Sequence, residues 1–201
     1  MADQPHPYDP ILFTNLTPPG FHRQAYAHIA GALRGCTRRS MISILDLYAK
    51  TRRRLEALEG QGLRLDAKQG PGAEGFAGLM RDLAEIARDI DMQIVSCAEE
   101  IDLRPCGIQP GKCVDDDFIP EAFGLEVTHK KNPGMRAACG CVESRDIGMY
   151  DSCLFGCQYC YATNSFAQAR LNHARHDPES PSLLGRHEPR PNGDELQLRL
   201  F

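Results

Sequence analysis

The chain has 201 residues, of which 42% are hydrophobic, and a formal net charge of −4. This length allows one substantial domain or two small ones, and the acidic balance argues against bulk affinity for nucleic acid. The sequence shows no secretory signal and no apolar run of membrane-spanning length, so we expect a cytoplasmic protein with no membrane contact.

The first hundred residues alternate short apolar runs with helical patterns. Strands are predicted at 11–13, 40–45 and 92–97, and helices at about 20–34, 48–58 and 76–90. This order predicts an α/β fold with parallel strands and crossover helices, and both the (β/α) barrel and the doubly wound sheet use it. Binding groups in such folds gather at the carboxyl ends of strands, so we expect Asp46, Cys97, Glu99 and Glu100 to face one rim.

The regular alternation lapses after residue 103. We expect residues 1–103 to form a partial (β/α) barrel, and residues 104–175 to complete the same domain with a cysteine-rich segment. Within that segment we predict a short helix starting near Phe118, a last strand over 145–150 and a helix over 162–173. Residues 176–201 carry charges, prolines and few large apolar groups, which predicts a flexible tail.

The distribution of cysteine is uneven. There are nine cysteines, and all but Cys36 lie between Cys97 and Cys160. The odd count, the clustering and the missing export signal oppose a disulfide scaffold and favour thiolates that hold metal in a reducing compartment. For Cys36 we expect the role of a small buried apolar residue.

The most specific motif is the run from Cys153 through Cys157 to Cys160, with the spacing C-x3-C-x2-C. Gly156 permits the tight turn that would let these three thiolates converge. Three ligands are one fewer than the usual four around an iron–sulfur cluster or a structural zinc ion. Either a fourth ligand comes from elsewhere, or the open position binds an exchangeable molecule.

This cysteine loop, with Tyr159 before its last thiol, resembles the cluster loop of radical S-adenosylmethionine enzymes. The fuller sequence resembles a bacterial family catalogued as domain of unknown function eighteen-forty-eight, over roughly residues 8–185. The matching segments are Tyr8–Ile11, Cys97–Leu103, Gly111–Asp116, Cys141–Tyr150, Cys153–Ala162 and His176–Pro178. In that family the first of these segments lies well inside the protein, so we expect this chain to lack an N-terminal portion; the alternative is a shorter homologue.

The resemblance implies a chemistry as well as a fold. By it, Cys153, Cys157 and Cys160 ligate a [4Fe-4S] cluster whose free iron binds S-adenosylmethionine, and an external electron donor supplies the electron. Tyr159 would pack near the adenine, although a core aromatic is an equal interpretation. The cluster loop opens the barrel in those enzymes but comes late here, so a barrel built in the usual way would be circularly permuted.

The remaining cysteines suggest a second centre. Four possible ligands are Cys97, Cys113, Cys139 and Cys141, which could hold an auxiliary cluster or zinc. In the simpler interpretation Cys97 and Cys106 are packed thiols, and only the pair Cys139 and Cys141 matters.

A competing function is a zinc-stabilised binding module without catalysis, with Cys139, Cys141, Cys157 and Cys160 as ligands. A further hypothesis follows from some DNA-repair radical enzymes, which carry a similar run of residues and leave a nucleic-acid lesion open as a substrate. The net charge gives that partner no support. The run Asp115–Asp117 suits the start of a helix better than a metal site. The substrate is unknown from the sequence.

Overall fold

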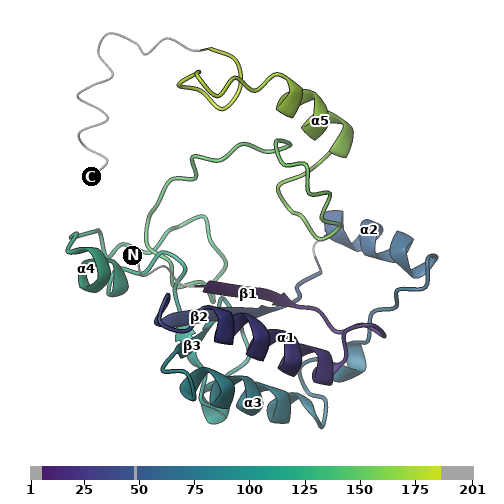
Figure 1. Ribbon diagram of the computed structural model, residues 1–201, viewed down its shortest axis with the longest axis vertical. Helices are drawn as coiled ribbons and strands as arrows, with labels where there is room; N and C mark the ends of the chain where they lie inside the picture. The colour runs from purple at the N-terminus through teal and green to yellow at the C-terminus, as the bar shows by residue number, and fades with distance from the viewer. Residues whose placement is uncertain (1–5, 48, 187–201) are drawn as a thin grey trace. The chain divides into compact units, whose positions relative to one another are not determined.

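The computed structural model describes residues 6–47 and 49–186 and has an α/β architecture (Figure 1). Its elements in chain order are β1 (His6–Ile11), α1 (Pro19–Ala32), β2 (Arg39–Ile44), α2 (Ala49–Glu59), the 3-10 turn η1 (Ala67–Gln69), α3 (Phe76–Arg88), β3 (Gln93–Cys97), the 3-10 turn η2 (Arg104–Cys106), β4 (Gln109–Gly111), α4 (Phe118–Phe123) and α5 (Phe166–Ala174). The expected alternation of strands and helices in the first hundred residues is confirmed, but β1 lies earlier than the strand predicted at 11–13 and shares only Ile11 with it.

The chain divides into two compact units. The first comprises Met1–Asp46 and Glu59–Ser144, and it contains the whole sheet. The second comprises Leu47–Leu58 and Arg145–Phe201, so it combines most of α2 with α5 and the cysteine loop.

The sheet of the first unit has four parallel strands in the order β1-β2-β3-β4. Met41 of β2 lies opposite Val95 of β3, and Cys97 at the end of β3 lies opposite Gly111 of β4. β1 and β4 are the two edges, so the sheet formed by the described residues is open. The parallel sheet is therefore confirmed, whereas its closure into a barrel stays a prediction.

The main core lies between the sheet and the helices α1 and α3, which cover the same side of the sheet (Figure 1). In the sequence, α1 follows β1 and α3 precedes β3. Leu79 and Leu83 of α3 are fully buried, and Ile86 and Ile90 pack partly buried against the same core. These four residues are the apolar face predicted from their spacing. β2 contributes Ile42, and Tyr26 of α1 is buried in the same cluster.

The predicted strand over 145–150 is wrong, since these residues form no strand in the structure. Ile147 and Tyr150 have exposed fractions of 89% and 51%, so the large apolar side chains of this segment do not bury a strand face. The strand β4 was not predicted because Gln109, Pro110 and Gly111 have no apolar character. A proline is tolerated there because β4 is an edge strand.

Two smaller expectations also change. Cys36 is exposed rather than buried, since it lies in the turn that follows α1. The last helix begins at Phe166 rather than near 162, because the hydroxyl of Ser165 accepts the backbone N–H of Gln168 at 3.2 Å and caps the helix there.

The predicted tail is described only in its first part. Over residues 176–186 the chain turns back on itself, and the Nδ1 atom of His176 lies 3.0 Å from the carbonyl oxygen of Leu183. The rest of the predicted tail, 187–201, lies outside the described residues. None of the helices in 6–47 and 49–186 has the length and apolar character needed to span a membrane.

Candidate metal-binding sites

The carboxyl edge of the sheet carries charged side chains from several strands. Glu99 follows β3, and its carboxylate accepts the backbone N–H of Ile44 at 2.8 Å. Asp46 follows β2 and forms an ion pair with Arg136. Burial raises the pKa of Glu99, and the nearby carboxylates of Asp46 and Asp9 raise it further, whereas the Ile44 N–H and Arg136 oppose this shift. Asp46 and Glu99 therefore share one rim, as the strand order predicted.

Between Cys97 and Glu99 the backbone takes an unusual conformation. Ala98 has φ of 52°, in the left-handed region that costs a non-glycine residue roughly 1–2 kcal/mol. Ala98 is buried and packs with Cys139 and Cys141. β3 ends at Cys97, and the turn at Ala98 directs Glu99 back toward the end of β2.

Four cysteines from separate segments gather at this edge. Cys97 ends β3, Cys113 follows β4 by two residues, and Cys139 and Cys141 belong to the segment after α4. The Sγ atoms of Cys97 and Cys113 lie 2.9 Å apart. The sulfur of Cys141 accepts the backbone N–H of Cys113 at 3.2 Å. The structure thus brings together the four residues that were predicted as a second centre.

Burial divides these four thiols into two pairs. Cys139 and Cys141 are buried, with exposed fractions of 2% and 4%, and their neighbours include Ala98, Cys97 and Val114. Cys113 is exposed and Cys97 is half-buried. The inner pair is therefore held by the fold, and the outer pair is accessible from solvent. Cys106, in contrast, packs in the main core, as the simpler interpretation proposed for that thiol.

Burial and neighbouring sulfurs shift the pKa of Cys97, Cys113 and Cys139. A hydrogen bond from Cys113 lowers the pKa of Cys97, and the same bond raises the pKa of Cys113 well above its usual range. Burial raises the pKa of Cys139, with a smaller contribution from Cys141. The single proton of Cys113 has a second acceptor, the sulfur of Met41 at 3.1 Å. Without a cation, only some of these sulfurs can carry negative charge, because like charges oppose one another.

The second unit contains the loop with Cys153, Cys157 and Cys160. All three are free thiols; the first two are exposed and Cys160 is half-buried. Gly156 has φ of 69°, in the left-handed region, which confirms the need for glycine at this turn. The Cys160 N–H donates to the carbonyl oxygen of Cys157 at 3.1 Å, which closes the last turn of the loop.

Arg54 of α2 holds the end of this loop in place. Its guanidinium donates to the carbonyl oxygens of Cys160 at 3.1 Å and Asn164 at 3.3 Å, and it also bonds the Thr163 carbonyl. The same group stacks on the ring of Phe166, 4.7 Å from its centroid. No spacing in the sequence could reveal this contact, because Arg54 lies more than a hundred residues before the loop.

The surroundings of Cys160 favour its thiolate. Burial raises its pKa, but the hydroxyl of Thr163 at 3.3 Å, backbone N–H groups and the charge of Arg54 outweigh that effect, so the pKa of Cys160 is lowered. Tyr159 beside it is half-buried. Phe155, in the middle of the loop, has an exposed fraction of 90%. The lowered pKa of Cys160 and the exposure of Cys153 and Cys157 are features of cysteines that react or bind metal as thiolates.

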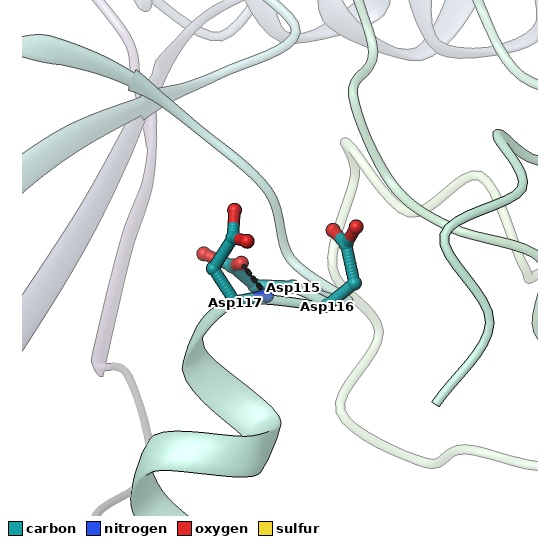
Figure 2. Close-up of side chains that lie close together, drawn as sticks. All are labelled: Asp115, Asp116 and Asp117. Carbon is teal, nitrogen blue, oxygen red and sulfur yellow. Dashed lines mark hydrogen bonds between the residues drawn. The ribbon is translucent and has the colours of Figure 1, made fainter. Parts of the chain in front are cut away.

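The closest cluster of possible metal ligands is acidic. Asp115, Asp116 and Asp117 have ligand atoms that all lie within 4.8 Å of one another (Figure 2). In the described part of the chain, no other group of three or more His, Cys, Asp or Glu residues meets this distance. No three cysteine sulfurs there meet this distance, in either the rim group or the loop.

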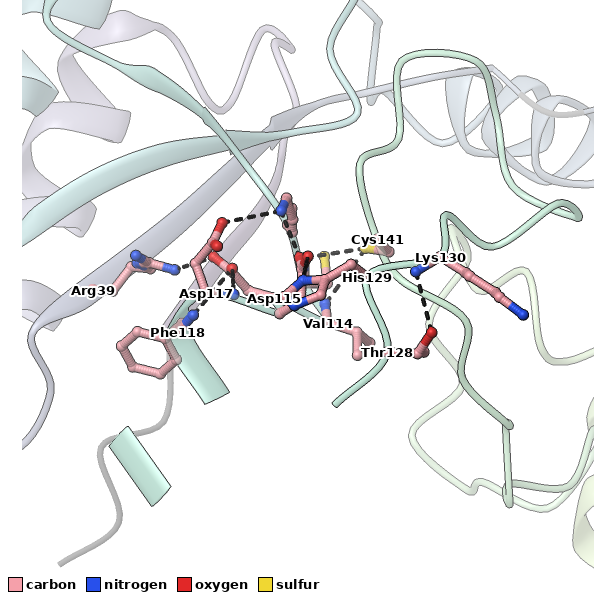
Figure 3. A network of polar contacts seen from close by, with 12 residues as sticks. Arg39, Val114, Asp115, Asp117, Phe118, Thr128, His129, Lys130 and Cys141 are labelled. Atoms are coloured by element: carbon pink, nitrogen blue, oxygen red, sulfur yellow. Dashed lines mark hydrogen bonds and ion pairs between the residues drawn. The ribbon is translucent and has the colours of Figure 1, made fainter. Parts of the chain in front are cut away.

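These three carboxylates have structural partners within the first unit (Figure 3). Asp115 accepts the backbone N–H groups of Asp117 and Phe118 at the start of α4, and it pairs with Arg39 at 2.5 Å. Lys112 and His129 flank Asp116 and lower its pKa to about 2. The prediction that this run stands at the start of a short helix is confirmed.

A pocket of about 380 Å³ opens beside the exposed thiol of Cys113. It lies within the first unit and is lined by Pro7, Met41, Cys113, Asp115, Phe118, Ile119 and Phe123. Most of its wall is apolar, and Cys113 is the residue that it shares with the cysteine group. No sequence pattern predicts this pocket, because its lining comes from three separate segments of the chain, at Pro7, at Met41 and over 113–123.

Comparison with known proteins gives one match. The family model described as Domain of unknown function (DUF1848) matches residues 6–162, so the chain belongs to this family, and the resemblance stated from its motifs is confirmed. No curated protein and no solved structure matches the chain.

Proposed function

We propose that this member of the family is an iron–sulfur protein in which Cys153, Cys157 and Cys160 hold a [4Fe-4S] cluster, as in radical S-adenosylmethionine enzymes. The observation that carries the proposal is a loop with three free thiols and one lowered thiol pKa, fastened by Arg54 to α2. Thiolate is the form of cysteine that binds iron. A loop fixed at its end and exposed at its thiols can receive a preformed cluster.

In this proposal the residues in and around the loop have different roles. The three thiolates would hold the cluster and leave one iron without a protein ligand. When bound, such a cluster would supply the one-electron chemistry that S-adenosylmethionine enzymes of this kind use. Arg54 would fix the carbonyl groups beside Cys160, and Thr163 would keep that sulfur ionised. Tyr159 is our candidate for packing against the bound nucleoside.

The proposal extends to the fold. Strands that follow one another in sequence order, with α1 and α3 on one side, are the arrangement of neighbouring strands in a barrel, whereas a doubly wound sheet reverses its order at a switch point. We therefore propose that β1 to β4 are part of a (β/α) barrel. A reducing, cytoplasmic location and an external electron donor complete the proposal, since both follow from reduced thiols and a one-electron cofactor.

Anaerobic reconstitution with iron and sulfide tests the cluster. We expect about four irons and four sulfides per chain at the loop, with a brown colour and a visible absorption band that dithionite bleaches. Replacement of Cys153 by alanine should abolish this loading without unfolding the chain, because Cys153 is exposed. The matched control is Cys36→Ala, an exposed cysteine of the other unit, which should load normally. A colourless protein after reconstitution would refute the proposal.

A further inference from the structure

We propose that Cys97, Cys113, Cys139 and Cys141 form a closed four-thiolate site for one tetrahedral metal ion, Zn²⁺, at the carboxyl edge of the sheet. The site is independent of the iron–sulfur loop, because its ligands all belong to the first unit and those of the loop belong to the second. Its role would be to join the segment after α4 to the ends of β3 and β4.

The first argument is convergence. Consecutive ligands in this group are separated by as many as 26 positions, from Cys113 to Cys139, so no local turn brings them together. The register does so instead: Cys97 lies opposite Gly111, and the chain continues for two residues to Cys113. The segment with Cys139 and Cys141 is anchored to the same place, since the Val142 N–H donates to the carbonyl oxygen of Val114 at 3.2 Å.

The second argument is the environment of the Cys141 sulfur. It accepts two backbone N–H groups, from Cys113 at 3.2 Å and from Val114 at 3.4 Å (Figure 3). The sulfur of a neutral thiol is a weak hydrogen-bond acceptor, whereas the sulfur of a metal-bound thiolate accepts N–H groups well. Cys141 is also nearly fully buried, where an isolated negative charge would be costly. A metal ion bound to the sulfur resolves this conflict, and N–H donors to sulfur are typical of metal–thiolate sites.

The third argument is charge. The rim beside the four thiols already carries Asp9, Asp46 and Glu99, and Arg136 is the cation that acts on Cys97 and Glu99. Ionising four thiols there would add negative charge to a negative surface. A divalent cation makes ionisation favourable, because it displaces the thiol protons as it binds. The exposed Cys113 gives the ion a route from solvent to the buried pair.

The spacing of the sulfurs favours a single ion over a cubane cluster. With zinc–sulfur bonds of about 2.3 Å, two sulfurs on one tetrahedral zinc lie roughly 3.8 Å apart. Cys97 and Cys113 are already within that distance, at 2.9 Å, whereas on a cubane each thiolate binds a different iron. No three of the four sulfurs lie within 4.8 Å of one another, so binding requires a change of side-chain rotamer in at least one cysteine.

The test is the zinc content of the full chain, purified with a thiol reductant and treated with Zn²⁺ alone. We expect one zinc per chain by elemental analysis, and the intense visible bands of tetrahedral cobalt thiolate when Co²⁺ replaces it. Cys113→Ser should lower the metal affinity at least tenfold and shift the cobalt bands, and it should still fold because Cys113 is exposed. Cys141→Ala should remove binding altogether.

Three results would overturn the proposal. They are a zinc content that Cys113→Ser and Cys141→Ala leave unchanged, the same loss in the control Cys36→Ala, or a disulfide between Cys97 and Cys113 in the reduced, zinc-treated protein, seen as a mass lower by two hydrogen atoms. Failure here is distinguishable from failure of the iron–sulfur proposal. Cys153→Ala should lose iron and keep zinc, and Cys113→Ser should lose zinc and keep the iron of the loop.

Discussion

Gly111 is the position where the structure predicts the clearest effect of a single methyl group. It ends β4 opposite Cys97, and a Cβ atom added there would lie 2.5 Å from Cγ2 and 2.7 Å from Cβ of Val95. Carbon atoms pack at about 3.5–4.0 Å, so the overlap is roughly 1 Å. Val95 is buried in the sheet and cannot turn away. We therefore expect Gly111→Ala to lower the free energy of unfolding by about 1–3 kcal/mol, the usual cost of overpacking.

Urea unfolding followed by circular dichroism measures this loss. In a chain of this size each kcal/mol corresponds to roughly 2–4 °C in Tm, so thermal unfolding should agree. The matched control is Gly78→Ala within α3, where an added Cβ has nothing within 4 Å. That variant should be more stable by up to about 1 kcal/mol, because alanine favours a helix over glycine.

Gly111→Ala also tests the zinc site proposed at the carboxyl edge of the sheet. If β4 moves away from Val95, Cys113 moves with it, so Gly111→Ala should also weaken the binding of zinc. A Gly111→Ala protein with the unfolding midpoint and zinc content of the wild type would refute both the steric reasoning and the register on which it rests.

Three further predictions concern single charges. Arg54→Gln should destabilise the second unit and raise the pKa of Cys160, measured by the pH dependence of its alkylation, whereas the exposed Arg53→Gln should do neither. Asp116→Asn should lower stability at neutral pH: the carboxylate, with its pKa of about 2, contributes above its unfolded value of about 3.9, and this contribution disappears as the pH falls through about 2. Glu99→Gln should have the opposite sign. The raised pKa means that the ionised carboxyl costs stability at neutral pH, so the variant should be more stable at pH near 7 and equal to the wild type below about 4.3. Unfolding curves at several pH values check both carboxyl variants, and an effect independent of pH would contradict them.

The sequence predicted the elements that have strong local patterns. The spacing of Leu79, Leu83, Ile86 and Ile90 located α3, and the apolar run of β2 located a central strand, because burial imposes a period on such segments. The strand predicted over 145–150 is absent, because Ile147 and Tyr150 are exposed and no burial stabilises a strand there. β4 was missed for the opposite reason, since its place is fixed by pairing with β3 and not by its own residues.

The candidate sites show the same limit. Clustering of cysteines predicted that Cys97, Cys113, Cys139 and Cys141 belong together, and the structure gathers them. Nothing in their spacing predicted which pair is buried, because burial depends on where the segment after α4 packs. Arg54 was missed altogether, since a long-range contact between a helix and a loop leaves no periodic signal.

Exposure distinguishes what the two thiol groups can do. Cys139 and Cys141 are enclosed by the fold, and a site built on them can offer a metal ion four sulfurs but no free position. Such a closed site suits stabilisation of a segment that has little regular structure of its own. Cys153 and Cys157 are exposed on a loop with only three thiols, so a group bound there keeps a position for another molecule. Under the two proposals, chemistry on a substrate would take place at the loop, and the four rim cysteines would stabilise the first unit.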